Sequence, residues 1–261
     1  MGQKSILTTL RKYRFIVLII GLVLLTACGG DFSAIDESTT GYFNEYIVYP
    51  FSLLIKWIAD HLSGSYGLSI IVITIALRLV VLPFMVKQQK QGKITQEMMK
   101  KIKPEIDAIQ EKYKDIQDKD KQLNMQRELS ELYETYNFNP VKMVTGCLPM
   151  IIQMPFLIGF YYAIRRTPEI AEQSFLWFNL GEVNILLALI AVLTYYIQAR
   201  VSLIGTEQTS KGPMAMMVYV SPIMIGIISF IMPAALPLYW TVGGLFMIIQ
   251  TVIIKKYVLA T

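Results

Sequence analysis

Long apolar stretches separated by polar segments dominate the chain. Five of these stretches are long enough to cross a bilayer, which takes roughly 20 helical residues. They predict crossings at residues 67–86, 141–164, 183–199, 213–231 and 236–254. The stretch MPAALP, residues 232–237, joins the last two crossings in a tight hairpin, and its prolines fall at helix ends, where proline is tolerated. The pattern therefore predicts an all-α polytopic membrane protein with five transmembrane helices.

The first 27 residues have the layout of a signal peptide, with basic residues followed by the short apolar run FIVLIIGLVLL. The run ends in LTAC, which resembles a bacterial lipobox whose cysteine is lipidated and becomes the mature N-terminus. We expect residues 1–27 to be cleaved before Cys28, and palmitate-type chains on Cys28 to anchor the protein to the outer leaflet. The alternative is an uncleaved first transmembrane helix that ends in an ordinary cysteine.

Two regions outside the predicted crossings have helical periodicity of their own. Residues 28–66 begin with a polar stretch and continue into 42–62, which predicts an amphipathic helix at the outer interface. Residues 87–140 repeat apolar positions at helical spacing on both sides of the polar turn KDIQDKDK. We expect this second region to be a charged helical hairpin.

The distribution of lysine and arginine predicts the orientation of the chain. Ten lysines and one arginine lie within 87–140, and further basic residues flank 200–212 and the tail 255–261. Basic residues concentrate on the cytoplasmic side of membrane proteins. These three segments are therefore expected in the cytoplasm, with the N-terminus and the loop 165–182 outside.

Composition supports the membrane assignment and excludes several other classes. Hydrophobic residues make up 54% of the chain and charged residues 16%, with a mean hydropathy of +0.48. The net charge of +5 reports orientation rather than nucleic-acid binding. No nucleophile–base set, phosphate-binding loop or metal-ligand cluster is found in the sequence, so we expect no enzymatic activity, no cofactor and no metal site.

Arg78 is the most informative single residue, because it lies near the middle of the first predicted crossing. A charge there costs about 2.5 to 3.5 kcal/mol and is usually paired with a carboxylate. The five crossings contain no Asp or Glu apart from Glu182 at an outer boundary. Arg78 is therefore either held by neutral groups and water in a polar recess, or it awaits an acid from another molecule. The residues that could line such a recess include Thr74, Gln153, Thr194, Gln198, Tyr239, Trp240, Thr241 and Gln250.

Several separated blocks resemble the YidC family of membrane protein insertases, related to mitochondrial oxidase-assembly and chloroplast Albino proteins. The blocks are YGLSIIVITIALRLVVLP, NPVKMVTGCLPMIIQMPFLIGFYYAI, FLWFNLG and PAALPLYWTVGGLFMIIQ. The resemblance implies a five-helix core with a hydrophilic groove that opens to the cytoplasm and is closed outside. Within it, Arg78, Thr74, Gln198 and Trp240 match groove-lining positions, and Gln153 and Tyr239 join them as substrate-binding candidates.

The resemblance implies that nascent membrane proteins are the clients, with the Sec translocon and the ribosome as further partners left open. The lipobox without a large outer domain is similar to the Gram-positive branch, which implies the plasma membrane of such a bacterium. We expect the chain to act as a monomer in contact with membrane lipids. Two alternatives remain at this point: a scaffolding membrane chaperone without insertase activity, and a small-molecule transporter.

Overall fold

The computed structural model describes residues 34–37, 39–114, 119–138, 148–204 and 213–258. The chain divides into two compact units, each considered by itself. The first contains Lys87–Met150 and the second contains Gly21–Val86 and Ile151–Thr261. The predicted signal peptide, Cys28, residues 141–147 of the second predicted crossing, and most of the 200–212 loop lie outside the described residues.

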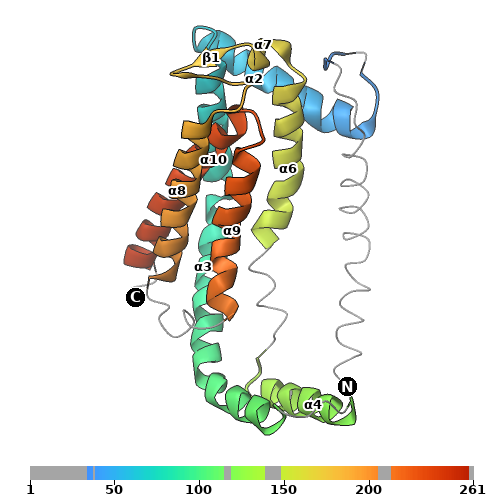
Figure 1. Cartoon of the computed structure of the whole chain (residues 1–261), viewed down its shortest axis with the longest axis vertical. Helices are drawn as coiled ribbons and strands as arrows, with labels where there is room; N and C mark the ends of the chain where they lie inside the picture. Colours follow the sequence, from blue (N-terminus) through green and yellow to red (C-terminus); the bar gives the residue numbers. More distant parts are fainter. Residues whose placement is uncertain (1–33, 38, 115–118, 139–147, 205–212, 259–261) are drawn as a thin grey trace. The chain divides into compact units, whose positions relative to one another are not determined.

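The second unit is built around a group of long apolar helices (Figure 1). They are the first part of α3 (Tyr66–Lys112), α6 (Leu148–Arg165), α8 (Ile185–Leu203), α9 (Pro213–Ser229) and α10 (Ala235–Ile253), which continues into the π-helical turn η3 (Ile254–Val258). Helix α8 packs against both α9 and α10. The α8–α10 contact is close: a Cβ on Gly244 would lie 2.7 Å from Cγ2 of Thr194. Small residues permit such close approach between membrane helices.

The ends of these helices follow local sequence signals. Asn184 caps α8, since its side-chain oxygen accepts a hydrogen bond of 2.9 Å from the backbone N–H of Leu187. At the other end of α8, the Lys255 ammonium donates to the carbonyls of Val201, Ser202 and Ile204 at 2.7 to 2.9 Å. The last carbonyls of a helix lack intrahelical partners and carry partial negative charge, so a cation is favourable there.

Many large apolar side chains on these helices are exposed, as expected for a surface that faces lipid rather than water. Helices α3, α8 and α10 with η3 are each long and apolar enough to cross a membrane. Helix α9 falls within the predicted crossing 213–231, and α6 overlaps the predicted crossing 141–164 but ends one residue beyond it, so the number five remains a prediction. The exposed side chains include Leu68, Val72, Ile75 and Leu79 of α3, Ile185, Leu186, Leu189 and Leu193 of α8, and Leu245, Ile249 and Val252 of α10.

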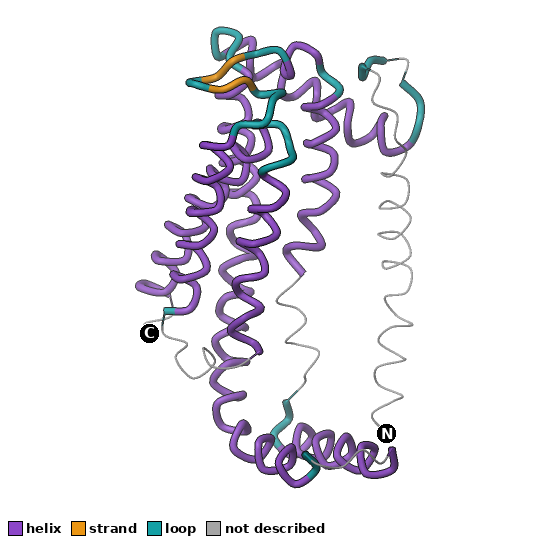
Figure 2. The backbone as a smooth tube through the Cα atoms, in the orientation of Figure 1, coloured by secondary structure: helices purple, strands orange, loops and turns teal. Residues whose placement is uncertain are grey.

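Short elements cover one end of the second unit (Figure 2). They are the π-helical turn η1 (Asn44–Val48) with α2 (Tyr49–His61), the single turn α7 (Pro168–Ala171), and a two-stranded sheet of β1 (Ser174–Phe175) and β2 (Phe178–Asn179). Helix α2 is joined to the α6–α7 connection by a buried hydroxyl pair, Ser52 to Thr167 at 2.8 Å, and to α7 itself by an ion pair, Lys56 to Glu169 at 2.9 Å. The small sheet adds β-structure that the sequence pattern did not predict.

The first unit contains the helical pair expected between the first two crossings. The later part of α3 and helix α4 (Lys119–Thr135) pack through a small core around Ile102, Ile106, Leu132 and Phe138. Polar links close the pair at its surface: Glu128 accepts hydrogen bonds from Lys112 at 2.7 Å and Tyr113 at 2.8 Å. The residues between the first predicted crossing and the hairpin are helical without a break, so that α3 is one helix of 47 residues. Lysine, glutamine, glutamate and methionine dominate this junction and all favour helix.

Candidate functional site

Arg78 lies well inside the apolar part of α3. It follows Tyr66 by twelve residues and precedes Lys87 by nine, which places it about 18 Å and 13 Å along the helix axis from these positions. The side chain is neither fully buried nor fully exposed. Arg78 therefore lies near the middle of the apolar part of α3, and part of the residue is accessible.

Two neighbouring helices supply the immediate surroundings of this guanidinium, and a third contributes through one hydrogen bond. The phenol of Tyr195 on α8 lies within hydrogen-bonding reach of it, and Tyr239 on α10 is close enough to interact electrostatically. The amide of Gln153 on α6 donates a 2.9 Å hydrogen bond to the Tyr239 hydroxyl. All these groups are neutral hydrogen-bonding side chains.

Gly243 on α10 provides the space for the Arg78 side chain. A Cβ at this position would lie 2.8 Å from Nη2 and 3.2 Å from Nε of Arg78. The guanidinium thus packs directly against the backbone of α10, in contact that any larger residue would disturb. Among the described residues, the ion pairs all lie elsewhere, and none brings a carboxylate to Arg78.

The other predicted site residues divide into two groups. Tyr239 lies close to Arg78, and Gln153 is linked to it through its hydrogen bond to Tyr239. Gln198 lies one turn beyond Tyr195 on the same face of α8. Thr74 is buried, and its hydroxyl donates a 2.6 Å bond to the carbonyl of Ile70. Trp240 is buried in the apolar core of the unit.

Sequence reasoning did not select Tyr195 or Gly243 as site residues. Both had a detectable signal. The Gly243–Gly244 pair in an otherwise apolar helix is typical of a close helix–helix contact. Tyr195 follows Thr194 in a predicted crossing and is one of two consecutive tyrosines there. The pattern gave no indication that either residue would meet Arg78.

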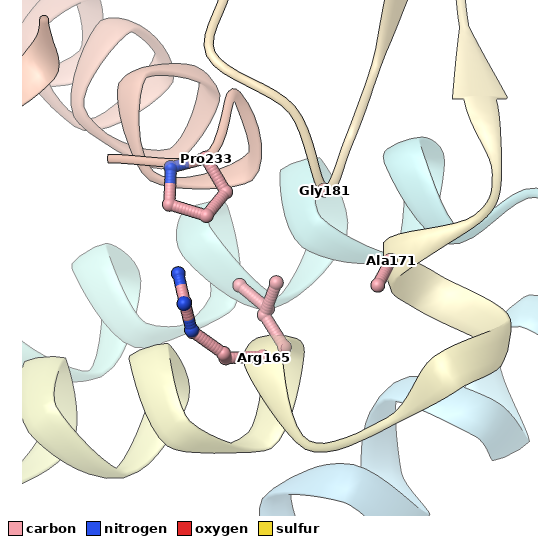
Figure 3. Close-up of a pocket in the computed structure, with 5 residues that line it drawn as sticks. Arg165, Ala171, Gly181 and Pro233 are labelled. Carbon is pink, nitrogen blue, oxygen red and sulfur yellow. The ribbon is translucent and has the colours of Figure 1, made fainter. Parts of the chain in front are cut away.

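A separate pocket of about 350 Å³ lies at the end of the second unit that carries α7. Figure 3 shows Arg165, from the last turn of α6, reaching toward Pro233, while Gly181 and Ala171 form another side. Gly181 has to be a glycine, since a Cβ there would lie 2.2 Å from the carbonyl oxygen of Ala171. None of the predicted site residues lines this pocket.

Metal ligands do not gather anywhere in the part of the chain that the structure describes. The groups around Arg78 offer binding through charge and hydrogen bonds. Neither the phenols nor the amide there forms a nucleophile–base pair of the kind that supports covalent catalysis.

Known proteins similar to this chain identify its family. The family model described as "60Kd inner membrane protein" matches residues 57–260. The membrane protein insertase MisCB of Bacillus subtilis is 44% identical over 253 residues, covering 92% of this chain and 91% of that protein. Membrane protein insertase YidC 2 of Listeria monocytogenes is 44% identical over 240 residues, covering 92% and 86%.

A solved structure, the active YidC insertase with its first transmembrane domain resolved, has a similar fold with a TM-score of 0.58. The match covers 84% of this chain and 47% of that one at 23% identity, so it supports the fold alone. The relatives are bacterial and are named insertases rather than enzymes, and with the apolar helices they indicate a protein of the cell membrane. The chain belongs to the YidC family of membrane protein insertases.

Proposed function

We propose that this protein inserts nascent membrane proteins into the bilayer and assists their folding, with Arg78 as the group that attracts acidic flanks of its clients. One observation carries the proposal: the Arg78 guanidinium lies at mid-span among neutral partners, and no described carboxylate pairs with it. An unpaired charge at this depth is costly, and intramembrane cations typically mark a functional pathway. A client carboxylate would supply the missing partner transiently.

The surroundings of Arg78 favour holding the charge in place without neutralising it. Gly243 lets the guanidinium rest on α10, and the Tyr195 phenol can accept one of its hydrogen bonds. A guanidinium has five N–H donors in a fixed fork, so several remain for a ligand. Because an arginine–carboxylate pair is commonly bidentate, a client Asp or Glu fits this remaining capacity.

Water in the interior of the second unit is part of the proposal. The Thr241 hydroxyl is buried on α10 without a hydrogen-bond partner among the described residues. Buried polar groups of this kind are commonly satisfied by water. A hydrated groove lined by Gln153, Gln198 and Tyr239, with Thr74 and Trp240 packed behind its wall, would shorten the water-free distance that a polar flank must cross. Charge is also far cheaper in such a groove than in lipid.

The transport step then needs no nucleotide. The acidic flank of a client enters the groove from the cytoplasm and is held near Arg78. The client's apolar segment moves into lipid, which it prefers. The membrane potential adds about 2.3 kcal/mol per charge for every 100 mV. The helical pair of the first unit receives clients or partner proteins, among which the Sec translocon and the ribosome are candidates.

The topology proposed with this mechanism places α2, α7 and the small sheet outside the cell. Cys28 carries the lipid anchor, and the first unit and the C-terminus are cytoplasmic. The dense links between α2 and the α6–α7 connection support a closed outer end. Exposed Tyr46 and Trp57 on η1 and α2 suit an interfacial position, where aromatic side chains are enriched.

The experiment compares Arg78→Ala and Arg78→Lys in proteoliposomes. It uses two versions of one single-span client, with acidic or neutral residues in the translocated flank. We expect Arg78→Ala to lose insertion of the acidic version and Arg78→Lys to retain most of it, because lysine keeps the charge. Arg165→Ala, which removes an exposed arginine outside this site, serves as the control and should insert both versions normally.

Equal insertion of the acidic client by wild type and Arg78→Ala would refute the mechanism. If site-specific crosslinks to the client also persisted in that variant, a scaffolding chaperone would be the better account.

A further inference from the structure

The turn between β1 and β2 exposes two large apolar side chains in an unfavourable backbone conformation. Phe175 pairs with Phe178, which leaves Leu176 and Trp177 as a two-residue turn. Leu176 has a φ of +55°, a region that two-residue turns normally fill with Gly, Asn or Asp. Its side chain is 72% exposed and that of Trp177 is 54% exposed. In water, both the strain and the exposure would be unfavourable.

The base of this hairpin is fixed to the helices of the second unit. The Phe175 ring lies directly on Gly67 of α3, where a Cβ would come within 2.1 Å of it, and Phe178 is buried. The Leu180 N–H donates to the Gln173 carbonyl at 2.9 Å, and the Ala235 N–H donates to the Leu180 carbonyl at 3.0 Å. The turn is therefore held outward by its own anchored base.

The contact with Gly67 also fixes the level of the turn along the bundle. Gly67 directly precedes Leu68, where the exposed apolar side chains of α3 begin and continue through Val72. That face of α3 belongs to a helix able to span a membrane. The hairpin projects to the side at this end of the unit (Figures 1 and 2). The turn thus continues the lipid-facing surface at the depth where that surface starts.

We propose that the Leu176–Trp177 turn inserts into the boundary between lipid headgroups and acyl chains at this end of the protein. Tryptophan prefers this boundary, because its ring is apolar and its N–H is polar. The stretch from Gln173 to Gly181 contains no charged residue, which suits a lipid surface better than a charged protein partner. Lipid contact also accounts for the leucine at position 176, where the positive φ would be less strained for Gly or Asn. The inference depends on the chain spanning the bilayer but not on any role of Arg78.

The turn can be tested by tryptophan fluorescence, because the chain has only three tryptophans. In full-length protein reconstituted into phosphatidylcholine vesicles, Trp57→Phe with Trp240→Phe leaves Trp177 as the only emitter. We expect blue-shifted emission that is quenched more by lipids brominated near the headgroup than by lipids brominated near the bilayer centre. Aqueous iodide should quench it weakly. The matched control retains only Trp240, which is 5% exposed and should respond little to any quencher.

Leu176→Asn provides a second variant, because asparagine tolerates positive φ and is polar. In the Trp177-only background it should reduce quenching by brominated lipid and increase quenching by iodide. Red-shifted emission with strong iodide quenching in the parent would overturn the proposal, since the turn would then face water. Protection from both iodide and brominated lipid would overturn it in favour of contact with protein. Client insertion by the protein with all three tryptophans in place, measured in separate vesicles, tests the proposed function independently.

Discussion

Gly243→Ala moves the Arg78 guanidinium without removing its charge, so it tests whether the position of this group matters. The added Cβ would lie 2.8 Å from Nη2, whereas ordinary van der Waals contact begins at about 3.4 Å. The α10 backbone is fixed by its packing on α8, so the flexible end of Arg78 is the part that moves. The displacement draws the guanidinium away from α10 and disturbs its contact with the Tyr195 phenol.

The effects on stability and on function should have opposite signs. Alanine is favoured over glycine inside a helix by about 0.5 to 1 kcal/mol, so the fold should be unharmed. A hydrogen bond to a charged group is worth about 1.5 to 3 kcal/mol. If the displaced guanidinium loses one such bond with the client carboxylate, insertion should fall about tenfold or more, because each 1.4 kcal/mol is a factor of ten.

The assay measures initial insertion rates of the acidic-flank and neutral-flank clients in proteoliposomes, together with the thermal stability of each variant. Gly226→Ala is the matched control, because it makes the same change inside α9. Its Cβ would meet Val192 of α8 at 3.0 Å rather than Arg78. We expect Gly243→Ala to slow only the acidic-flank client and Gly226→Ala to slow neither. A stable Gly243→Ala protein that inserts the acidic client at the wild-type rate would refute the reasoning.

Three further predictions concern the stability of other parts. Lys255→Met should reduce the free energy of unfolding by about 2 kcal/mol or more, because three carbonyls at the end of α8 lose a charged donor. The melting temperature of the purified protein should fall accordingly. An unchanged melting temperature would contradict the capping role. Ile102→Ala should cost about 2 to 5 kcal/mol in the small core of the first unit and increase hydrogen exchange in α4, since Ile102 is fully buried. Hydrogen exchange in α4 of the Ile102→Ala variant at the wild-type rate would show that Ile102 does not stabilise this core. Hydrogen bonds from Lys112 and then Tyr113 hold the pKa of the Glu128 carboxyl below its usual range. The stabilisation from these hydrogen bonds is complete when the pH is above the pKa of Glu128 in the unfolded protein. It is lost as the pH falls through the lower pKa of Glu128 in the folded protein. Protection of α4, corrected for intrinsic exchange, should therefore weaken in mild acid, and Glu128→Gln should remove this part of the pH dependence. An identical pH profile in that variant would show that Glu128 is not responsible.

The sequence alone was sufficient for the features that depend on local pattern. Runs of apolar residues predicted the membrane class, and α3, α8 and α10 are long and apolar enough to span. Helical periodicity predicted two helices in the first unit, and α3 and α4 there share a small core around Ile102. The absence of intramembrane carboxylates already marked Arg78 as unusual. Hydropathy and helix periodicity act between neighbours along the chain, and the inference about Arg78 needs only the composition of the predicted crossings.

Only the tertiary structure decided which groups meet across helices. The contact of Arg78 with Gly243 and Tyr195, and that of Lys255 with the end of α8, join residues far apart in sequence. The turn at Leu176 could not be predicted either, because leucine carries no signal for a positive φ. Such contacts depend on how helices rotate and pack against one another. Hydropathy constrains that packing weakly in a membrane, since a lipid-facing side and a helix-facing side can both be apolar.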